Sequence, residues 1–345
     1  METWIHRMIK ERSGRRLTAC AVIIGCIALL LFTQQRYIQN FISGPHNLSA
    51  ADLDQIKDVS AAPQYFARIS GSKAIDTGLE KITVRTKHGV KKSESVDAKY
   101  YALVMGDKFL IYEGGYTAKT TVEGVLEPMP AEVSQRLFSD KEMRDNRSRF
   151  YPFYLNSKDS FRSIGWFVIA ALSCLLVILA SIGIPAWLRL RNPDSHPLCK
   201  KVSSWGRPHL ISAAAERQFN SPNAFKAGSW TVTKEFLIQS SFFSFDILRL
   251  DDLLWAYKKV TQRRINFIPA GKTYAAFLIC SGGNAEIQGG EIAVDRILGL
   301  AAEAAPWAAF GFSEECQAYF NKSKAEFCAV VEARKQEHLN PSSDT

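Results

Sequence analysis

Residues 164–188 read IGWFVIAALSCLLVILASIGIPAWL, and this run decides which class of protein the sequence encodes. It has 25 residues without a charged side chain, whereas about 20 apolar residues suffice for a helix to cross the hydrocarbon core of a bilayer. Trp166 and Trp187 stand near its two ends, as in the aromatic belts of membrane helices. A core helix of a soluble domain would show a polar stripe, but this run offers only two serines and a cysteine. The sequence therefore predicts a transmembrane helix.

A second uncharged run, LTACAVIIGCIALLLFT, covers residues 17–33. Its 17 residues reach the lower limit for a helical span. A cleaved signal peptide is the alternative, because a basic segment precedes the run. The apolar part of a signal peptide is usually shorter, about 7–15 residues, and no small-x-small cleavage pattern follows here. We therefore expect an uncleaved transmembrane helix, which makes the chain a two-span membrane protein.

The basic residues that flank the first run predict the orientation, since cytoplasmic flanks are enriched in lysine and arginine. Only Arg36 lies just after the run, whereas five cations precede it: Arg7, Lys10, Arg12, Arg15 and Arg16. Two spans return the chain to the side where it began, so both termini are expected in the cytoplasm of a bacterial inner membrane. The second run has basic residues on both sides and does not discriminate.

The seven cysteines are distributed unevenly along the chain. None lies in residues 34–163, and four follow the second span without the CxxC spacing of metal sites. Free thiols suit a reducing cytosol, and a cysteine-free segment suits an oxidising compartment. The distribution agrees with the predicted orientation, although the low overall frequency of cysteine could produce it as well.

The spans divide the sequence into an α+β membrane protein with a small β-rich domain between two transmembrane helices and a β-rich C-terminal domain closed by helices. We expect a basic tail at 1–16, an extracytoplasmic domain at 34–163 and a proline-containing linker at 189–208. A cytoplasmic domain at 209–337 and a disordered tail at 338–345 complete the chain. Five short strand patterns between the spans fit either a small barrel, like the oligonucleotide/oligosaccharide-binding fold, or a small α+β domain.

The C-terminal half contains the segments LLWAYKK, NFIPAGKTYA, PWAAFGF and FCAVVEARK. In these segments the chain resembles an uncharacterised bacterial family of two-span membrane proteins with a pleckstrin-homology-like cytoplasmic domain. The resemblance is best over residues 229–335, and it implies an architecture but no activity and no site residue. Two-span mitochondrial ubiquitin ligases share the layout, but the C-terminal half here lacks their paired, metal-spaced cysteines and histidines.

No motif in the sequence predicts a catalytic, cofactor-binding or metal-binding residue, so we expect no cofactor. Gly271-Lys272-Thr273 spells the end of a phosphate-binding loop, but Asn266 stands where that loop needs its first glycine. His46 and His88 are isolated. The net charge of +9 is spread over the whole chain rather than gathered into one stripe, which argues against nucleic-acid binding.

Two sets of residues remain as candidates for contacts. The cations that follow the second span are candidates for the membrane surface, since each basic group near an anionic leaflet gains about 1 kcal/mol; they are Arg189, Arg191, Lys200 and Lys201. Trp255 and Tyr257 would face the same side of a strand, where they serve either core packing or a partner surface.

The expected partners are the lipid bilayer and a protein, which is either another protein or a second copy of the chain. The leading hypothesis is a non-enzymatic interaction, scaffold or sensor protein that links an extracytoplasmic domain to a cytoplasmic one. An envelope-associated enzyme of unrecognised type is the rival hypothesis, and a subunit of a larger complex is the third.

Overall fold

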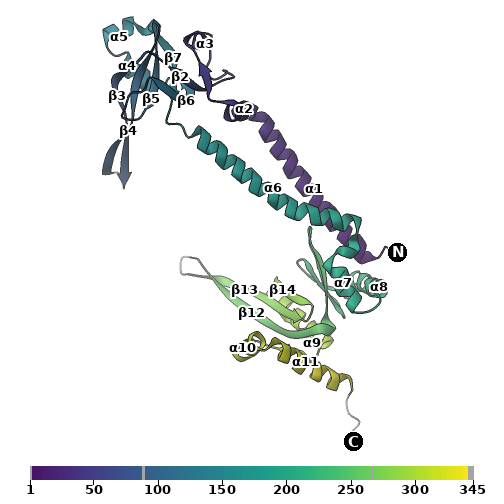
Figure 1. Cartoon of the computed structure of the whole chain (residues 1–345). Helices are drawn as coiled ribbons and strands as arrows, with labels where there is room; N and C mark the ends of the chain where they lie inside the picture. Colours follow the sequence, from purple (N-terminus) through teal and green to yellow (C-terminus); the bar gives the residue numbers. More distant parts are fainter. Residues whose placement is uncertain (1, 88–89, 266–267, 341–345) are drawn as a thin grey trace. The chain divides into compact units, whose positions relative to one another are not determined.

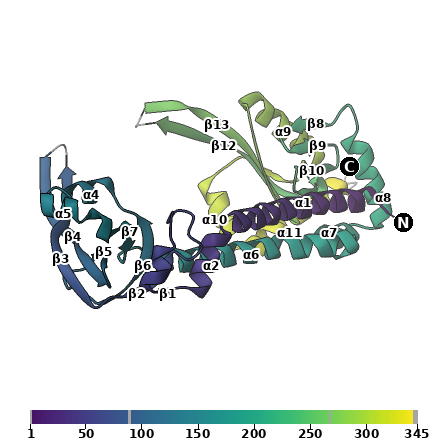
Figure 2. The same cartoon turned by 90° about the horizontal axis from the view of Figure 1, so that it is seen from above.

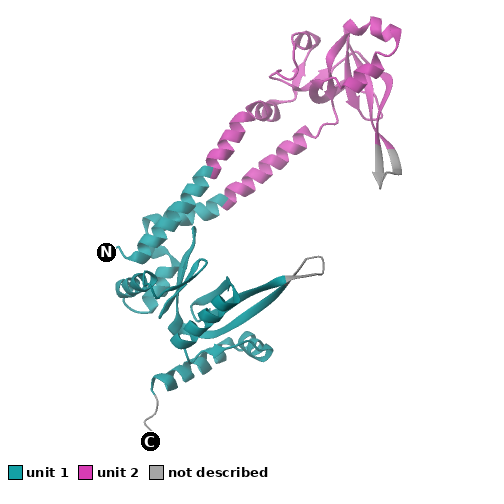
Figure 3. Ribbon diagram, turned by 180° about the vertical axis from the view of Figure 1, so that it is seen from behind, with its two compact units in different colours: residues 1–22, 179–345 teal, residues 23–178 magenta. Residues whose placement is uncertain are grey.

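The computed structural model describes residues 2–87, 90–265 and 268–340, and it is an α+β structure with 48% helix and 30% strand. Two long apolar helices, α1 (Trp4–Thr33) and α6 (Phe161–Arg191), contain the two uncharged runs (Figure 1). The chain forms two compact units, and the division cuts both long helices (Figure 3). We call residues 1–22 with 179–345 the terminal unit, and residues 23–178 the central unit.

The long helices leave their apolar side chains uncovered. In each helix, only 6% of the residues in the most apolar 18-residue stretch are buried. Leu30 is 65% exposed and Phe167 is 74% exposed, whereas the core helix of a soluble protein would bury such residues. The prediction of two long apolar helices is confirmed, and each helix extends beyond the uncharged run that it contains.

The central unit is a seven-stranded sheet in the order β1-β2-β6-β7-β5-β4-β3. Its strands are β1 (His46–Leu48), β2 (Phe66–Ser70), β3 (Lys73–Lys87), β4 (Val90–Met105), β5 (Lys108–Gly114), β6 (Thr121–Pro128) and β7 (Phe150–Asn156). The short helices are α2 (Gln35–Ser43), α3 (Ala50–Asp54), α4 (Ala131–Leu137) and α5 (Lys141–Asp145), with a 3₁₀ turn, η1, at Arg147–Arg149. Neighbouring strands are antiparallel except for the pairs β1–β2 and β5–β7, which are parallel.

The link between β2 and β3 closes this sheet into a barrel. β2 pairs with β6 and β3 pairs with β4, yet only two residues separate β2 from β3. The Gly71 amide donates to the Thr120 carbonyl and the Ser72 amide to the Val104 carbonyl, each at 2.9 Å. A Cβ on Gly71 would lie 2.6 Å from Leu103 Cγ, so the kink needs glycine. The bend therefore brings the two ends of the strand order together, and the likeness to a particular fold stays a prediction.

The terminal unit contains two four-stranded sheets, ordered β11-β10-β9-β8 and β14-β13-β12-β15. Their strands are β8 (Phe225–Ala227), β9 (Trp230–Val232), β10 (Phe236–Ser240), β11 (Phe245–Arg249), β12 (Leu253–Ile265), β13 (Ile268–Cys280), β14 (Gly283–Gly289) and β15 (Ala309–Phe310). The helices are α7 (Pro197–Ser204), α8 (Pro208–Phe219), α9 (Glu291–Ala304), α10 (Glu314–Lys322) and α11 (Lys324–Leu339), with 3₁₀ turns η2 (Pro193–Ser195) and η3 (Leu250–Asp252).

Helices cover both faces of the β12–β14 sheet. On one face, Val294 and Ile297 of α9 pack against residues such as Leu278. On the other face, Phe327 and Val331 of α11 pack against Leu254, Trp255 and Ile279. Leu278 and Ile279 are neighbours in β13, and neighbouring side chains of a strand point to opposite faces of its sheet.

The first three turns of α1 belong to the core of the terminal unit. Trp4 is 8% exposed, and Ile5 and Ile9 are each 2% exposed. They pack with apolar residues of α7, α8, β10 and β11, which are Leu198, Val202, Ala215, Phe236, Ile238, Phe245 and Ile247. Figures 1 and 2 both show the N-terminus beside α8. The segment expected as a basic tail at 1–16 is therefore not a free tail, because residues 4–16 are helical and their apolar residues form a buried face. Its cytoplasmic location stays a prediction.

The expected linker at 189–208 is also wrong, since most of it is helical. Its prolines do not interrupt structure but begin it: Pro193, Pro197 and Pro208 each stand in the first turn of η2, α7 or α8. Proline suits that position because the first amides of a helix have no partner within the helix. Leu198 and Val202 of α7 are four residues apart and join the same core as Trp4.

Candidate functional site

The four cations expected at the membrane surface have different surroundings in the terminal unit. Arg189 and Arg191 lie in the last turn of α6, where the Arg191 guanidinium lies 4.1 Å from the centre of the Trp187 ring. Lys200 is exposed on α7. Lys201 is held within the unit, because its Nζ lies 2.8 Å from Asp246 Oδ1 and its side chain is only 19% exposed. Lys201 therefore binds a protein carboxylate, and the other three cations keep exposed atoms.

The two aromatic candidates differ as well. Trp255 is 2% exposed, and its Nε1 donates to the Gly311 carbonyl at 2.7 Å. Its ring packs against Phe320 and Phe327, which attach α10 and α11 to the sheet. Tyr257 is half-buried and stacks on Phe277. The partner-surface hypothesis for Trp255 is wrong, since this residue packs in the core, while Tyr257 keeps part of its surface.

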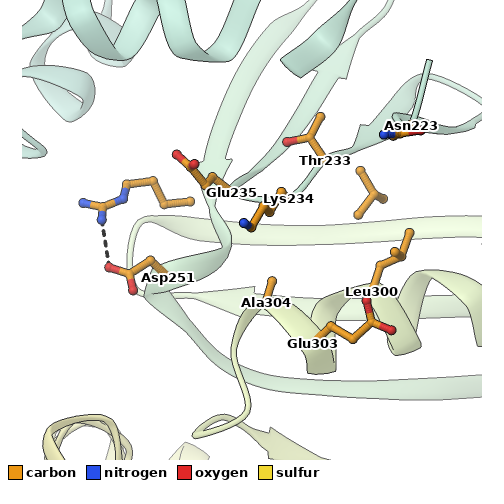
Figure 4. Close-up of a pocket in the computed structure, with 10 residues that line it drawn as sticks. Asn223, Thr233, Lys234, Glu235, Asp251, Leu300, Glu303 and Ala304 are labelled. Atoms are coloured by element: carbon orange, nitrogen blue, oxygen red, sulfur yellow. Dashed lines mark hydrogen bonds and ion pairs between the residues drawn. The ribbon is translucent and has the colours of Figure 1, made fainter. Parts of the chain in front are cut away.

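A cavity of about 700 Å³ in the terminal unit was not indicated by any sequence motif. It lies between the β9–β10 turn, η3 and the C-terminal end of α9, with Glu235 on the turn side and Glu303 on the helix side (Figure 4). Its lining carries both charge signs and consists of Asn223, Val232, Thr233, Lys234, Glu235, Arg249, Asp251, Leu300, Glu303 and Ala304. These described residues include no histidine or cysteine that could pair as base and nucleophile.

Protein groups already bind part of the polar lining. Asp251 Oδ2 accepts from Arg249 at 2.8 Å and from Lys335 at 2.9 Å. Thr233 Oγ1 donates to Gln218 at 2.8 Å. Burial raises the pKa of the adjacent Asp252 carboxyl above its usual value. The Asp251 ion pairs connect η3 with α11, so this carboxylate has a structural role, and the geometry supports a polar binding hollow better than a catalytic centre.

A cluster of possible metal ligands links the first turn of α1 to the segment after α6. His6 Nε2 lies 3.0 Å from Asp194 Oδ1, and the Cys199 thiol is close enough for the three ligand atoms to lie within 4.8 Å of one another. Burial, with a smaller contribution from Asp194, raises the pKa of the Cys199 thiol to about 11. The neutral thiol donates to the Pro193 carbonyl at 3.3 Å. Three donors are one fewer than a structural zinc site uses. The printed contacts of the cluster are the His6–Asp194 pair and the thiol hydrogen bond, which join α1 to the segment after α6.

The turn between β10 and β11 exposes two adjacent aromatic rings. We call Ser241, Phe242, Phe243 and Ser244 the aromatic turn. Phe242 is 62% exposed and Phe243 is 44% exposed. The Phe243 carbonyl accepts from Arg16 Nε at 2.8 Å, and the Arg15 guanidinium lies 4.7 Å from the centre of the Phe242 ring. Sequence reasoning missed this turn, although ten uncharged residues at 236–245 gave a signal for it.

The central unit holds a buried carboxylate between its strands. Glu113 is 3% exposed, and its carboxylate lies 2.9 Å from Lys81 Nζ. Tyr100 donates to it at 3.4 Å, and burial together with this carboxylate raises the Tyr100 pKa to about 12. The group joins β3, β4 and β5 on the outside of the barrel and has a structural role. Of the residues considered in the sequence, His88 and Asn266 lie outside the described residues.

Comparison with protein-family models, with curated proteins and with solved structures finds no match for this chain.

Proposed function

We propose that this chain is a two-span protein of the bacterial inner membrane that links an extracytoplasmic barrel to a cytoplasmic domain without catalysing a reaction. In this proposal α1 and α6 cross the bilayer, the central unit carries the extracytoplasmic barrel, and the terminal unit carries the cytoplasmic domain. The bilayer is one partner, and a further protein or a second copy of the chain is the other.

The observation that carries the proposal is the shared core of the terminal unit. Trp4, Ile5 and Ile9 precede α1's apolar run, whereas Leu198 and Val202 follow the apolar run of α6, and all five pack together. Residues that pack in one core must lie on one side of a membrane. If α1 and α6 both cross the bilayer, these five residues are on the same side, whereas a single crossing would separate them. This argument is independent of flanking charge, and it supports placing both ends of the chain in one compartment.

The same core argues against removal of α1 as a signal peptide. Cleavage after the apolar run would take away Trp4, Ile5 and Ile9, which are buried in the terminal unit. It would also remove the hydrogen bond from the Ile5 amide to Ser212 Oγ at 3.2 Å and the Arg7–Glu216 ion pair at 3.0 Å. A segment with these contacts is better explained as a permanent part of the fold.

The strand order supports the proposed domain types. In the central unit, β2 with β3 acts as one bent strand. Apart from the short β1, this gives five strands around a core, as in the oligonucleotide/oligosaccharide-binding fold. In the terminal unit, four antiparallel strands, three more antiparallel strands and then α9 follow in sequence. That order supports the pleckstrin-homology-like domain that the resemblance implies, and neither fold by itself specifies a ligand.

The lining of the 700 Å³ cavity in the terminal unit supports a function without catalysis. A catalytic carboxylate needs to be free to exchange a proton with a substrate, and the ion pairs of Asp251 oppose that role.

Paired reporter fusions test this proposal. Alkaline phosphatase, which is active only outside the cytoplasm, is fused after residue 160 of a truncated chain, where the barrel is complete. Green fluorescent protein is fused after residue 345 of the full chain, and each reporter is also exchanged to the other site as a control. We expect phosphatase activity only at 160 and a fluorescent C-terminal fusion. Phosphatase activity at 345 would refute the proposed orientation, and soluble fusion proteins would refute membrane insertion.

A further inference from the structure

We propose that the aromatic turn, Ser241–Ser244, inserts into the lipid headgroup region and anchors the terminal unit to the bilayer that α1 and α6 cross. The inference rests on the proposed function in one respect, the membrane crossing of α1. It adds a membrane contact outside the two long apolar helices, and the molecule that the turn contacts is lipid.

Contacts with α1 place the turn at the edge of the helix's apolar run. Arg12 donates to Ser240 Oγ at 3.0 Å, Arg15 to the Phe242 carbonyl at 3.5 Å and Arg16 to the Phe243 carbonyl at 2.8 Å. The arginine nearest the apolar run, Arg16, therefore contacts the tip of the β10–β11 hairpin, and Arg12, one turn earlier in α1, contacts the end of β10. Arg16 is the last charged residue before Leu17, where the uncharged run begins. The tip therefore lies at the depth where a bilayer changes from headgroups to hydrocarbon.

The side chains at the tip suit that depth. Phe242 and Phe243 pack edge to face, with ring centres 4.7 Å apart, and both remain substantially exposed. Exposed aromatic rings next to each other lower their free energy when they enter the apolar edge of a membrane. Ten uncharged residues, 236–245, surround the tip in the sequence, so insertion would carry no charge of this hairpin into the bilayer.

Five of the eight backbone polar groups in the turn have hydrogen-bond partners. The Ser241 amide donates to the Ser244 carbonyl at 2.9 Å, and the Ser244 amide donates to Ser241 Oγ at 3.0 Å. The Phe242 and Phe243 carbonyls accept from Arg15 and Arg16. Backbone groups that are already bonded cost less to transfer out of water, so the turn can leave the aqueous phase as a unit.

Charge distinguishes lipid from a soluble protein as the occupant. Arg15 and Arg16 lie beside the rings, and Glu11 is the acidic side chain that pairs with Arg12 and Arg15. Cations around an apolar tip match the phosphate groups that lie just above the hydrocarbon of a bilayer. A soluble partner would need to reach this turn within the headgroup layer, at the point where α1 enters it.

Photocrosslinking to lipid tests the anchor in the full chain, reconstituted into nanodiscs of phosphatidylethanolamine and phosphatidylglycerol. A benzophenone amino acid, which resembles phenylalanine in shape, replaces Phe242 in one variant and Phe243 in a second. Ile292 of α9, which is 85% exposed in the terminal unit, is the aqueous control, and Phe167 of α6, which is 74% exposed, is the control for the span. Adducts are identified by mass spectrometry of the intact protein.

We expect lipid adducts at positions 242 and 243 in about fivefold excess over position 292, and abundant adducts at position 167. Adducts at 167 without any excess at 242 and 243 would overturn the anchor while leaving the transmembrane helices intact. No adduct at 167 would refute the membrane crossing and the anchor with it. A protein-mass adduct at 242 or 243 in place of lipid would assign the turn to a second copy or another protein and would also overturn the inference.

Discussion

Replacing Ile5 by alanine tests whether the N-terminal turns of α1 are part of the terminal unit's core. Ile5 is 2% exposed and packs in the cluster that also contains Phe236 and Ile238. Truncation of a fully buried isoleucine to alanine costs about 2–5 kcal/mol, because transfer free energy is lost and a cavity remains. For a unit of this size, each kcal/mol lowers the melting temperature by about 2–4 °C. We therefore expect Ile5→Ala to melt about 4–20 °C below the unsubstituted protein.

The control is the same substitution further along the same helix. Ile24 is 48% exposed within the apolar run, so Ile24→Ala changes helix composition without opening a cavity in the terminal unit. Melting of both variants in the same detergent is followed by intrinsic fluorescence. Hydrogen exchange of β10 and β11 gives a readout that belongs to the terminal unit alone, and we expect faster exchange there only in Ile5→Ala. Equal melting temperatures, or unchanged exchange in β10 and β11, would refute the packing of α1 against these strands.

Two further predictions address the barrel and the segment after α6. Gly71→Ala should lower the melting temperature of the central unit much more than Gly115→Ala. A Cβ at Gly71 would lie 2.6 Å from the Val104 carbonyl, whereas a Cβ at Gly115 would meet nothing within 4 Å. Equal shifts in differential scanning calorimetry would contradict the barrel closure. Burial, and then the nearby Arg189 charge, lowers the pKa of His196 to about 4. The unfolded chain therefore binds more protons than the folded protein between about pH 6.5 and 4, and the free energy of unfolding should fall as the pH is lowered through this window. After allowance for solvent screening of a half-buried ring, the free energy of unfolding should be about 1 kcal/mol lower at pH 5 than at pH 7. In urea titrations at these two pH values, His196→Asn should abolish the difference while keeping an acceptor for the Leu198 amide.

Much of the secondary structure followed from local pattern. An uncharged run longer than the hydrocarbon core is recognisable without any tertiary contact, and both runs lie in helices with exposed apolar side chains. The five strand patterns between the spans fall within β2 to β6, because alternation of apolar and polar residues is a property of each strand alone. The expected turn at Gly106 joins β4 to β5 with φ 64°, a conformation that glycine adopts without strain.

The errors arose where one local signal fits two tertiary outcomes. Trp255 and Tyr257 face one side of a strand in either case, and only the docking of α10 and α11 decides that Trp255 is buried. Pro193 and Pro197 suit a linker as well as the start of a helix, and the packing of Leu198 in the core selects the helix. The position of Lys201 after the second apolar run suits a membrane-facing cation, but in the structure it binds Asp246, which lies 45 residues further along the chain.

The sequence by itself determined the two apolar helices, the β-rich segments on either side of α6 and the uneven distribution of cysteine, because each of these depends on composition or short-range periodicity. Tertiary structure alone decided that the first turns of α1 complete the core beneath β10, and that Phe242 and Phe243 lie next to Arg15 and Arg16. These contacts join residues more than 200 positions apart, and no periodicity within one segment specifies which distant segment will cover its apolar face.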